Sequence, residues 1–194
     1  MIAGLILAAG ESTRMGSDKA LLRFRGRSFL ETILAALRDA SLERIAVVLG
    51  HHAEEIQRAV NLAGVAVVIN PEYRRGQTSS FQAGLRALHG TDLDAVVLCL
   101  VDHPAVSSQT VRTLVDSFRQ SNAPVVIPTY RGQRGHPVLI SRTLFAELLN
   151  LDPEQGANSV VRKNRDATQL VEVADAGILV DVDDTETYRR LGDS

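Results

Sequence analysis

Cysteine and aromatic residues are scarce in this sequence of 194 residues, which has one cysteine, five phenylalanines, three tyrosines and no tryptophan. A single thiol excludes an internal disulfide and any zinc or iron–sulfur site built from several cysteines. Few aromatic rings argue against the stacking surfaces of single-strand nucleic-acid binders. Positive charge is not in excess either, because 21 Lys and Arg stand against 23 Asp and Glu. Nucleic acids and anionic membranes are therefore not expected partners.

Long apolar runs are also missing. The longest, Ala95–Val101, has seven residues, whereas a membrane-spanning helix needs about 18 or more. The apolar start, Met1–Ala9, lacks the basic residues that open a signal peptide. Hydrophobic residues make up 45% and charged residues 23% of the chain, as in ordinary globular proteins. We expect a soluble, cytoplasmic protein that folds as one domain over residues 1–194 without a structural metal.

Short apolar segments alternate with segments of helical spacing along the whole chain. The apolar segments are typical of strands covered on both faces, and they are Leu5–Ala9, Ile45–Leu49, Val65–Ile69, Ala95–Val101 and Val125–Ile127, with a last short strand expected at Ile178–Val180. The helical spacing covers Phe29–Leu37, Ala53–Val60, Phe81–Leu88 and Val111–Phe118. This alternation predicts an α/β fold of three layers with a doubly wound, mainly parallel, Rossmann-like sheet. Its ligand crevice should lie at the carboxyl ends of the strands.

Polar residues mark the expected helix starts. Ser28, Ser107 or Ser108, and Asp184 have the side chains that cap a helix N-terminus. The glycine-rich stretch Thr129–Pro137 carries arginine and glutamine residues and is expected to form a surface loop that reaches over the crevice.

The segment that follows the first strand combines two glycines with two cations. Gly10 and Gly16 allow backbone N–H groups to point at phosphate oxygens, while Arg14 and Lys19 supply positive charge. Their spacing matches neither the Walker A loop nor the dinucleotide-binding Gly-x-Gly-x-x-Gly. The segment therefore predicts an anion site of another kind, although the same residues also suit a polar turn without a ligand.

Read in full, this segment runs Leu-Ala-Ala-Gly-x-Ser-x-Arg-Met-Gly-x-x-Lys. The string resembles the signature loop of nucleotidyltransferases that join an NTP to a phosphorylated acceptor. Four further elements, at residues 70–85, 101–104, 135–139 and 181–186, are similar in kind and order to those of the MobA-like NTP transferases, in particular the molybdenum cofactor cytidylyltransferases. The resemblance implies the nucleotide-diphospho-sugar transferase fold, transfer from CTP with release of pyrophosphate, and Mg²⁺ as cofactor.

The resemblance also assigns roles to individual residues. Arg14, Lys19 and Asp102 would be catalytic. The nucleotide would contact Leu7, Ala8, Ala9, Gly10, Arg14, Lys19, Ser79, Ser80 and Gly84, and the acceptor would contact His136, Gln155 and Gly156. Since serine hydroxyls at a helix start often only cap it, capping remains a second interpretation of Ser79 and Ser80.

Two aspartates are candidates for holding the metal. Asp102 ends the most apolar strand, where a carboxylate is costly to bury unless it is paired or bound to a cation. A parallel sheet can bring the loop of Asp183 beside it, and Mg²⁺ on NTP phosphates takes one or two carboxylates. Asp181 competes with Asp183 for the second position. Without a metal, Asp102 would cap a turn, and Asp183 or Asp184 would cap the last helix.

Three residues depart from the family's pattern, and Pro153-Glu154 is inserted into the element that ends at one of them, which leaves the acceptor open. His103 stands where the family has glutamine, Asn158 where it has arginine and Thr185 where it has proline. Ala9 favours CTP, because Leu-Ala-Ala-Gly goes with CTP in the family and Leu-Ala-Gly-Gly with GTP. The expected partners are CTP or another NTP and a phosphorylated pterin, and possibly a molybdoenzyme. The alternatives are a transferase for a sugar phosphate or methylerythritol phosphate, and a nucleotide-binding partner of a molybdoenzyme without turnover.

Overall fold

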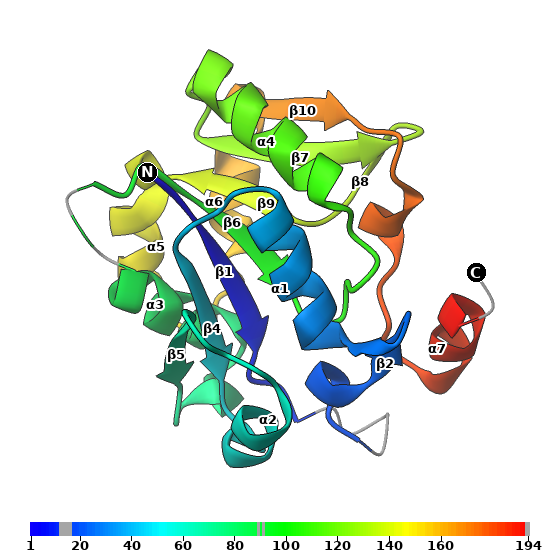
Figure 1. The fold of residues 1–194 in the computed structure, drawn as a ribbon. Helices are drawn as coiled ribbons and strands as arrows, with labels where there is room; N and C mark the ends of the chain where they lie inside the picture. Colours follow the sequence, from blue (N-terminus) through cyan, green and yellow to red (C-terminus); the bar gives the residue numbers. More distant parts are fainter. Residues whose placement is uncertain (12–16, 89, 91, 193–194) are drawn as a thin grey trace.

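A computed structural model describes residues 1–11, 17–88, 90 and 92–192. Its centre is an eight-stranded sheet in the order β10-β7-β9-β6-β1-β4-β5, with β8 paired to β7 (Figure 1). The strands are β1 Ile2–Ala8, β4 Ile45–Leu49, β5 Ala66–Ile69, β6 Ala95–Leu100, β7 Val125–Tyr130, β8 Gln133–Arg134, β9 Val138–Ser141 and β10 Thr168–Glu172. Strand β9 runs antiparallel to β6 and β7, whereas β1 is parallel to both β4 and β6. The sheet is therefore mainly parallel, as predicted.

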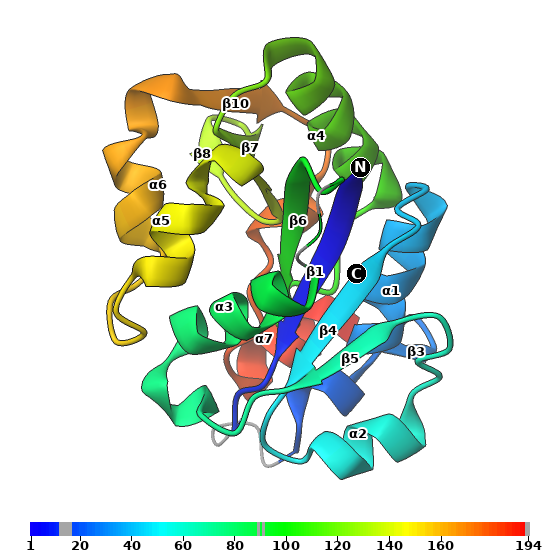
Figure 2. The same cartoon turned by 90° about the vertical axis from the view of Figure 1, so that its left-hand side faces the viewer.

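Helices cover both faces of the sheet (Figures 1 and 2). One face carries α1 Phe29–Asp39 and α4 Ser108–Ser121, the other carries α3 Gln77–Leu88, α5 Phe145–Asn150 and α6 Asn158–Lys163, and the remaining helices are α2 Ala53–Ala59 and α7 Thr185–Gly192. Alternate residues of β1 enter different cores, with Ile6 on the α1 side and Leu5 on the α3 side. Two-sided burial explains why these strands are apolar at every position. Among the described residues, no helix has the length and hydropathy to cross a membrane.

The expected helix starts are confirmed. Ser28 accepts a hydrogen bond from the backbone N–H of Glu31, whose carboxylate accepts one from the Ser28 N–H, so the two form a capping box. Ser107 caps α4, and Asp184 accepts a hydrogen bond from the backbone N–H of Thr187 in α7.

One predicted strand is wrong, and two strands of the structure, β9 and β10, have only a weak pattern in the sequence. Ile178–Val180 does not form a strand, because Asp175 accepts a hydrogen bond from the Gly177 N–H and starts a 3-10 helix over Ala176–Leu179. Strand β9 has only four residues, and β10 is largely exposed, so neither shows the long apolar run of a central strand.

The stretch Thr129–Pro137 is a packed hairpin rather than a loop over the crevice. Strand β8 pairs with the end of β7 around a turn at Arg131 and Gly132, both with positive φ. A Cβ on Gly135 would lie 2.3 Å from the Ile178 carbonyl oxygen, and the His136 N–H donates to that oxygen. These contacts hold the hairpin against the 3-10 helix.

Gly84 lets α3 approach the sheet closely, and its replacement is expected to be costly. A Cβ at this position would lie 2.3 Å from Leu5 Cδ1 and 2.9 Å from Val48 Cγ2. We expect Gly84→Ala to lower the free energy of unfolding by about 1–3 kcal/mol, the usual cost of overpacking a core. Urea denaturation measures this, with Gly156→Ala as control because a Cβ there meets no atom within 4 Å. Equal stability of the two variants would contradict this packing role.

Candidate active site

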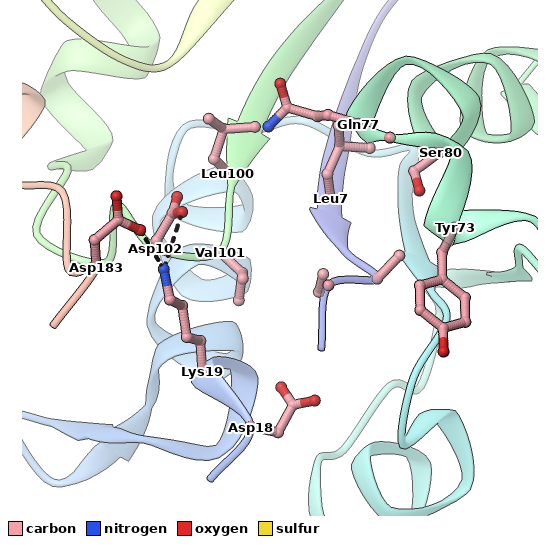
Figure 3. A pocket seen from close by; sticks show the side chains of 14 residues that line it. Leu7, Asp18, Lys19, Tyr73, Gln77, Ser80, Leu100, Val101, Asp102 and Asp183 are labelled. Carbon is pink, nitrogen blue, oxygen red and sulfur yellow. Dashed lines mark hydrogen bonds and ion pairs between the residues drawn. The ribbon is translucent and has the colours of Figure 1, made fainter. Parts of the chain in front are cut away.

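A cavity of about 430 Å³ opens where β1 and β6 end (Figure 3). Eight of the residues predicted from the sequence line it, namely Leu7, Ala8, Ala9, Gly10, Lys19, Ser80, Asp102 and Asp183. The crevice therefore lies at the carboxyl ends of parallel strands, where the topology places it. Arg14 and Gly16 lie outside the described residues.

Lys19 joins the two predicted metal-binding carboxylates on one side of the cavity. Its Nζ lies 2.6 Å from Asp183 Oδ1 and 3.4 Å from Asp102 Oδ2 (Figure 3). Lys19 begins a 3-10 helix, Asp102 follows β6, and Asp183 precedes α7. The Val182 N–H donates to the Asp102 carbonyl at 2.9 Å, which fixes the segment of Asp183 beside the end of β6. Three distant parts of the chain thus place one cation between two anions.

The second oxygen of Asp102 has a different environment. Oδ1 is buried and has no hydrogen-bond partner among the described residues. A donor atom of Asp102, one of His103 and one of Asp181 lie within 4.8 Å of one another. Burial, followed by the charge of Asp102, raises the pKa of Asp181. Negative charge is therefore concentrated here, and the carboxylate oxygens are ligands that suit a divalent cation.

Ser79 and Ser80 are held by the buried Asn70, which belongs to the matched element 70–85 but was assigned no site role from the sequence. Asn70 Nδ2 donates to both serine Oγ atoms at 3.0 Å. The single O–H of Ser79 faces two carbonyl acceptors, with Oγ 3.0 Å from the Glu72 oxygen and 2.9 Å from the Gly76 oxygen. Ser79 does not belong to the cavity lining. Ser80 lines the cavity. Of the two serines, Ser80 is the one placed to contact a ligand.

Besides Ser79, four predicted contact residues do not line this cavity. Gly84 is at the contact between α3 and the sheet. The ring of His136 stacks on that of His103 with centroids 4.8 Å apart, and burial lowers its pKa to about 4. The Gln155 carbonyl accepts a hydrogen bond from Thr78 Oγ1, so Gln155 and its neighbour Gly156 belong to a turn packed on the start of α3. These residues do not line the cavity, and their contacts with the nucleotide or the acceptor stay predictions.

Tyr73 and Gln77 line the cavity but were not predicted. Tyr73 donates from its hydroxyl to Glu11 Oε1 at 3.1 Å, and Arg74 Nε donates to the same oxygen at 2.7 Å. The hydrogen bond from Arg74 is the main cause of the lowered pKa of Glu11. This pairing ties the segment after Gly10 to the far wall of the cavity. No local sequence pattern signals such a contact between residues 62 positions apart.

Asp18 is a third unpredicted lining residue, although it lies within the motif string. It is 6% exposed, its Oδ1 accepts a hydrogen bond from the Ala20 N–H, and its Oδ2 has no hydrogen-bond partner among the described residues. His52 Nδ1 lies 3.6 Å from that second oxygen. Burial is the main cause of the raised pKa of Asp18. A buried carboxylate with one unsatisfied oxygen costs stability, which is common at functional sites.

We expect Asp18→Asn to stabilise the fold at neutral pH, since it removes a buried charge and keeps a capping oxygen. Because the folded state raises the pKa of Asp18, the charged carboxylate destabilises the fold above that pKa, and protonation relieves the penalty as the pH falls. The gain should be on the order of 1 kcal/mol at pH 8 and should vanish in acid. Chemical denaturation at several pH values measures it, and a gain independent of pH would contradict this cause.

Comparison with known proteins places this geometry among nucleotidyltransferases. The sequence-family model of the MobA-like NTP transferase domain matches residues 4–169 of this chain. The chain is 29% identical to nicotine blue oxidoreductase of Paenarthrobacter nicotinovorans, over 98% of this chain and 96% of the relative. It is 27% identical to molybdenum cofactor cytidylyltransferase of Escherichia coli, over 95% and 92%.

Solved structures agree with these matches. The crystal structure of Rv0371c from Mycobacterium tuberculosis superposes with a TM-score of 0.86 and 33% identity, over 100% of this chain and 97% of that chain. A structure of Rv0371c in complex with manganese superposes with a TM-score of 0.84 and 31% identity, over 100% and 98%. The expected nucleotide-diphospho-sugar transferase fold is thereby confirmed.

Proposed function

Since the chain belongs to the MobA-like NTP transferase domain family and is a nucleotidyltransferase, we propose that it transfers CMP from CTP to a molybdopterin-type cofactor and releases pyrophosphate. One observation carries this proposal. The cavity at the strand ends joins Gly10 to the Lys19 ammonium held between Asp102 and Asp183. Small residues give a triphosphate access to backbone N–H groups, and the ammonium neutralises its charge. The cytidylyltransferase relative supports the choice of nucleotide and acceptor.

The residues of the cavity suit a reaction that depends on position and charge. A phosphate oxygen of the acceptor attacks the α-phosphorus in line, and pyrophosphate leaves. Because that oxygen is already anionic at neutral pH, no strong base is needed. Lys19 would neutralise the phosphates and the leaving pyrophosphate. Ser80, fixed by Asn70, would orient the nucleoside.

The donor atoms fit a divalent cation. Asp102 and Asp183 would hold Mg²⁺, and the manganese complex of Rv0371c supports a cation in this family. When bound, the ion neutralises phosphate charge and polarises the α-phosphate. Asp102 follows the central strand β6, which would fix the position of the ion. In the absence of an ion, the Lys19 ammonium balances the charge of the two carboxylates.

Pyrophosphate release tests the proposal when it is measured with each of the four NTPs, first without an acceptor and then with a pterin, a sugar phosphate or methylerythritol phosphate. Turnover that requires both CTP and the pterin supports it. Turnover only with a sugar phosphate or methylerythritol phosphate would move the chain to another acceptor class. Tight nucleotide binding without turnover would favour a regulatory partner of a molybdoenzyme.

A further inference from the structure

The two oxygens of Asp102 face different groups. Oδ2 lies 3.4 Å from the Lys19 ammonium, which also binds Asp183. Oδ1 lies on the other side, 3.9 Å from His103 Nε2, where it is buried and has no hydrogen-bond partner among the described residues. A cation binding at the Oδ2 edge has to compete with an ammonium group. A cation that binds at Oδ1 would instead lie beside the imidazole of His103.

His103 is oriented as a metal-binding histidine is. It is 8% exposed, and its Nδ1 lies 2.8 Å from the Val180 carbonyl oxygen. A carbonyl only accepts hydrogen bonds, so Nδ1 carries the proton and the lone pair of the neutral ring is on Nε2. Histidine ligands in proteins are commonly fixed by such a bond from the other ring nitrogen to a backbone carbonyl. The stacked ring of His136 supports the same orientation from one face.

Asp181 completes a set of three donors. Three donor atoms, one from each of Asp102, His103 and Asp181, lie within 4.8 Å of one another. The hydrogen bond from the Val182 N–H to the Asp102 carbonyl holds Asp181 at this place. Ligand atoms about 2.1 Å from one ion can be up to about 4.2 Å apart. A small side-chain rotation is therefore enough to close the set around an ion.

We propose that Asp102, His103 and Asp181 form a divalent-cation site that binds Mn²⁺ in preference to Mg²⁺ and does not require the nucleotide. Mg²⁺ prefers oxygen ligands, whereas an imidazole nitrogen favours the transition ions. Asp102 would contribute Oδ1 here and Oδ2 to the edge that faces Lys19. The inference shares Asp102 with the proposed transferase site, but it does not depend on the acceptor or on turnover.

Electron paramagnetic resonance of the full chain with MnCl₂ tests this site without nucleotide. Wild-type protein should bind one Mn²⁺ ion. In competition, its affinity for Mn²⁺ should exceed its affinity for Mg²⁺ by more than about tenfold. Spin-echo modulation should show a ¹⁴N nucleus coupled to the bound ion. His103→Gln should abolish that modulation and weaken Mn²⁺ binding by about tenfold or more, while Mg²⁺ affinity stays unchanged. Asp181→Asn should weaken Mn²⁺ binding similarly, whereas the matched variant Asp183→Asn should retain both the affinity and the modulation.

Absence of ¹⁴N modulation in wild-type protein, or unchanged Mn²⁺ affinity in His103→Gln, would overturn the inference. Thermal unfolding checks that each variant is folded. If His103→Gln does not fold, the Mn²⁺ affinity of Asp181→Asn and the ¹⁴N modulation of the wild-type protein decide the question. A loss of Mn²⁺ affinity in Asp183→Asn alone would place the ion at the Lys19 edge and also contradict the inference. Pyrophosphate release measured with Mg²⁺ separates the two proposals, because it can persist when this site fails.

Discussion

Asp102→Ala is expected to reduce CTP-dependent pyrophosphate release by about three orders of magnitude or more, the scale seen when a charge-stabilising group is removed from a transition state. The side chain lies at the end of β6, beside Lys19, and both of its oxygens face candidate cation positions. Its loss would remove the proposed cation site and leave the Lys19 ammonium with one carboxylate fewer. The rate constant under saturating CTP and Mg²⁺ measures the effect.

Asp116→Asn is the matched control for this variant. Asp116 lies on the exposed surface of α4 and pairs only weakly, at 3.5 Å, with Arg119, so the control should keep the wild-type rate. Both variants should unfold near the wild-type temperature, because Asp102 is only partly buried. Activity like that of the wild type in Asp102→Ala would remove this residue from the active site.

Lys19→Ala is expected to weaken CTP binding by about 10- to 150-fold, corresponding to about 1.5–3 kcal/mol for a hydrogen bond to a charged group. The Lys19 side chain is 13% exposed, and its ammonium lies between two carboxylates. Without it, both carboxylates face the incoming phosphates with no neutralising charge from this position. Titration calorimetry with CTP and Mg²⁺ gives the dissociation constant.

The exposed Lys163 provides the control for this substitution. Lys163 ends α6, its ammonium pairs with Glu147 of α5, and its side chain is 71% exposed. Lys163→Ala should therefore bind CTP as the wild type does. An unchanged dissociation constant in Lys19→Ala would contradict the phosphate role of Lys19.

The central strands were predictable because burial on both faces leaves a local signature. Leu5 and Ile6 belong to opposite cores, so the strand that contains them is apolar at successive positions. The edge strand β10 lacks this signature because most of its side chains are exposed. The segment at Ile178 illustrates the opposite error: an apolar triplet forms a 3-10 helix because the side chain of Asp175 caps it.

The charged half of the site was also predictable from sequence. Lys19, Asp102 and Asp183 were predicted to share one site, and their charged groups lie together. Asp102 follows a strand of the parallel sheet, where the topology predicts a crevice. Asp183 does not follow a strand, and the hydrogen bond from the Val182 N–H to the Asp102 carbonyl holds its segment beside β6.

Residues whose position depends on tertiary contacts were missed. Tyr73, which donates a hydrogen bond to Glu11, and Asn70, which donates to Ser79 and Ser80 of α3, were given no site role. The acceptor role of His136 stays a prediction, and the structure adds that its ring stacks on that of His103.

Binding of a triphosphate in the cavity of Lys19 and Asp102 is the claim on which the proposed function depends, and calorimetry measures it most directly. We expect titration of CTP with Mg²⁺ into the wild-type chain to give saturable heat at one site, with much weaker binding of CMP, which lacks the two terminal phosphates. Absence of heat with every ribonucleoside triphosphate, or equal affinity for CTP and CMP, would contradict the account.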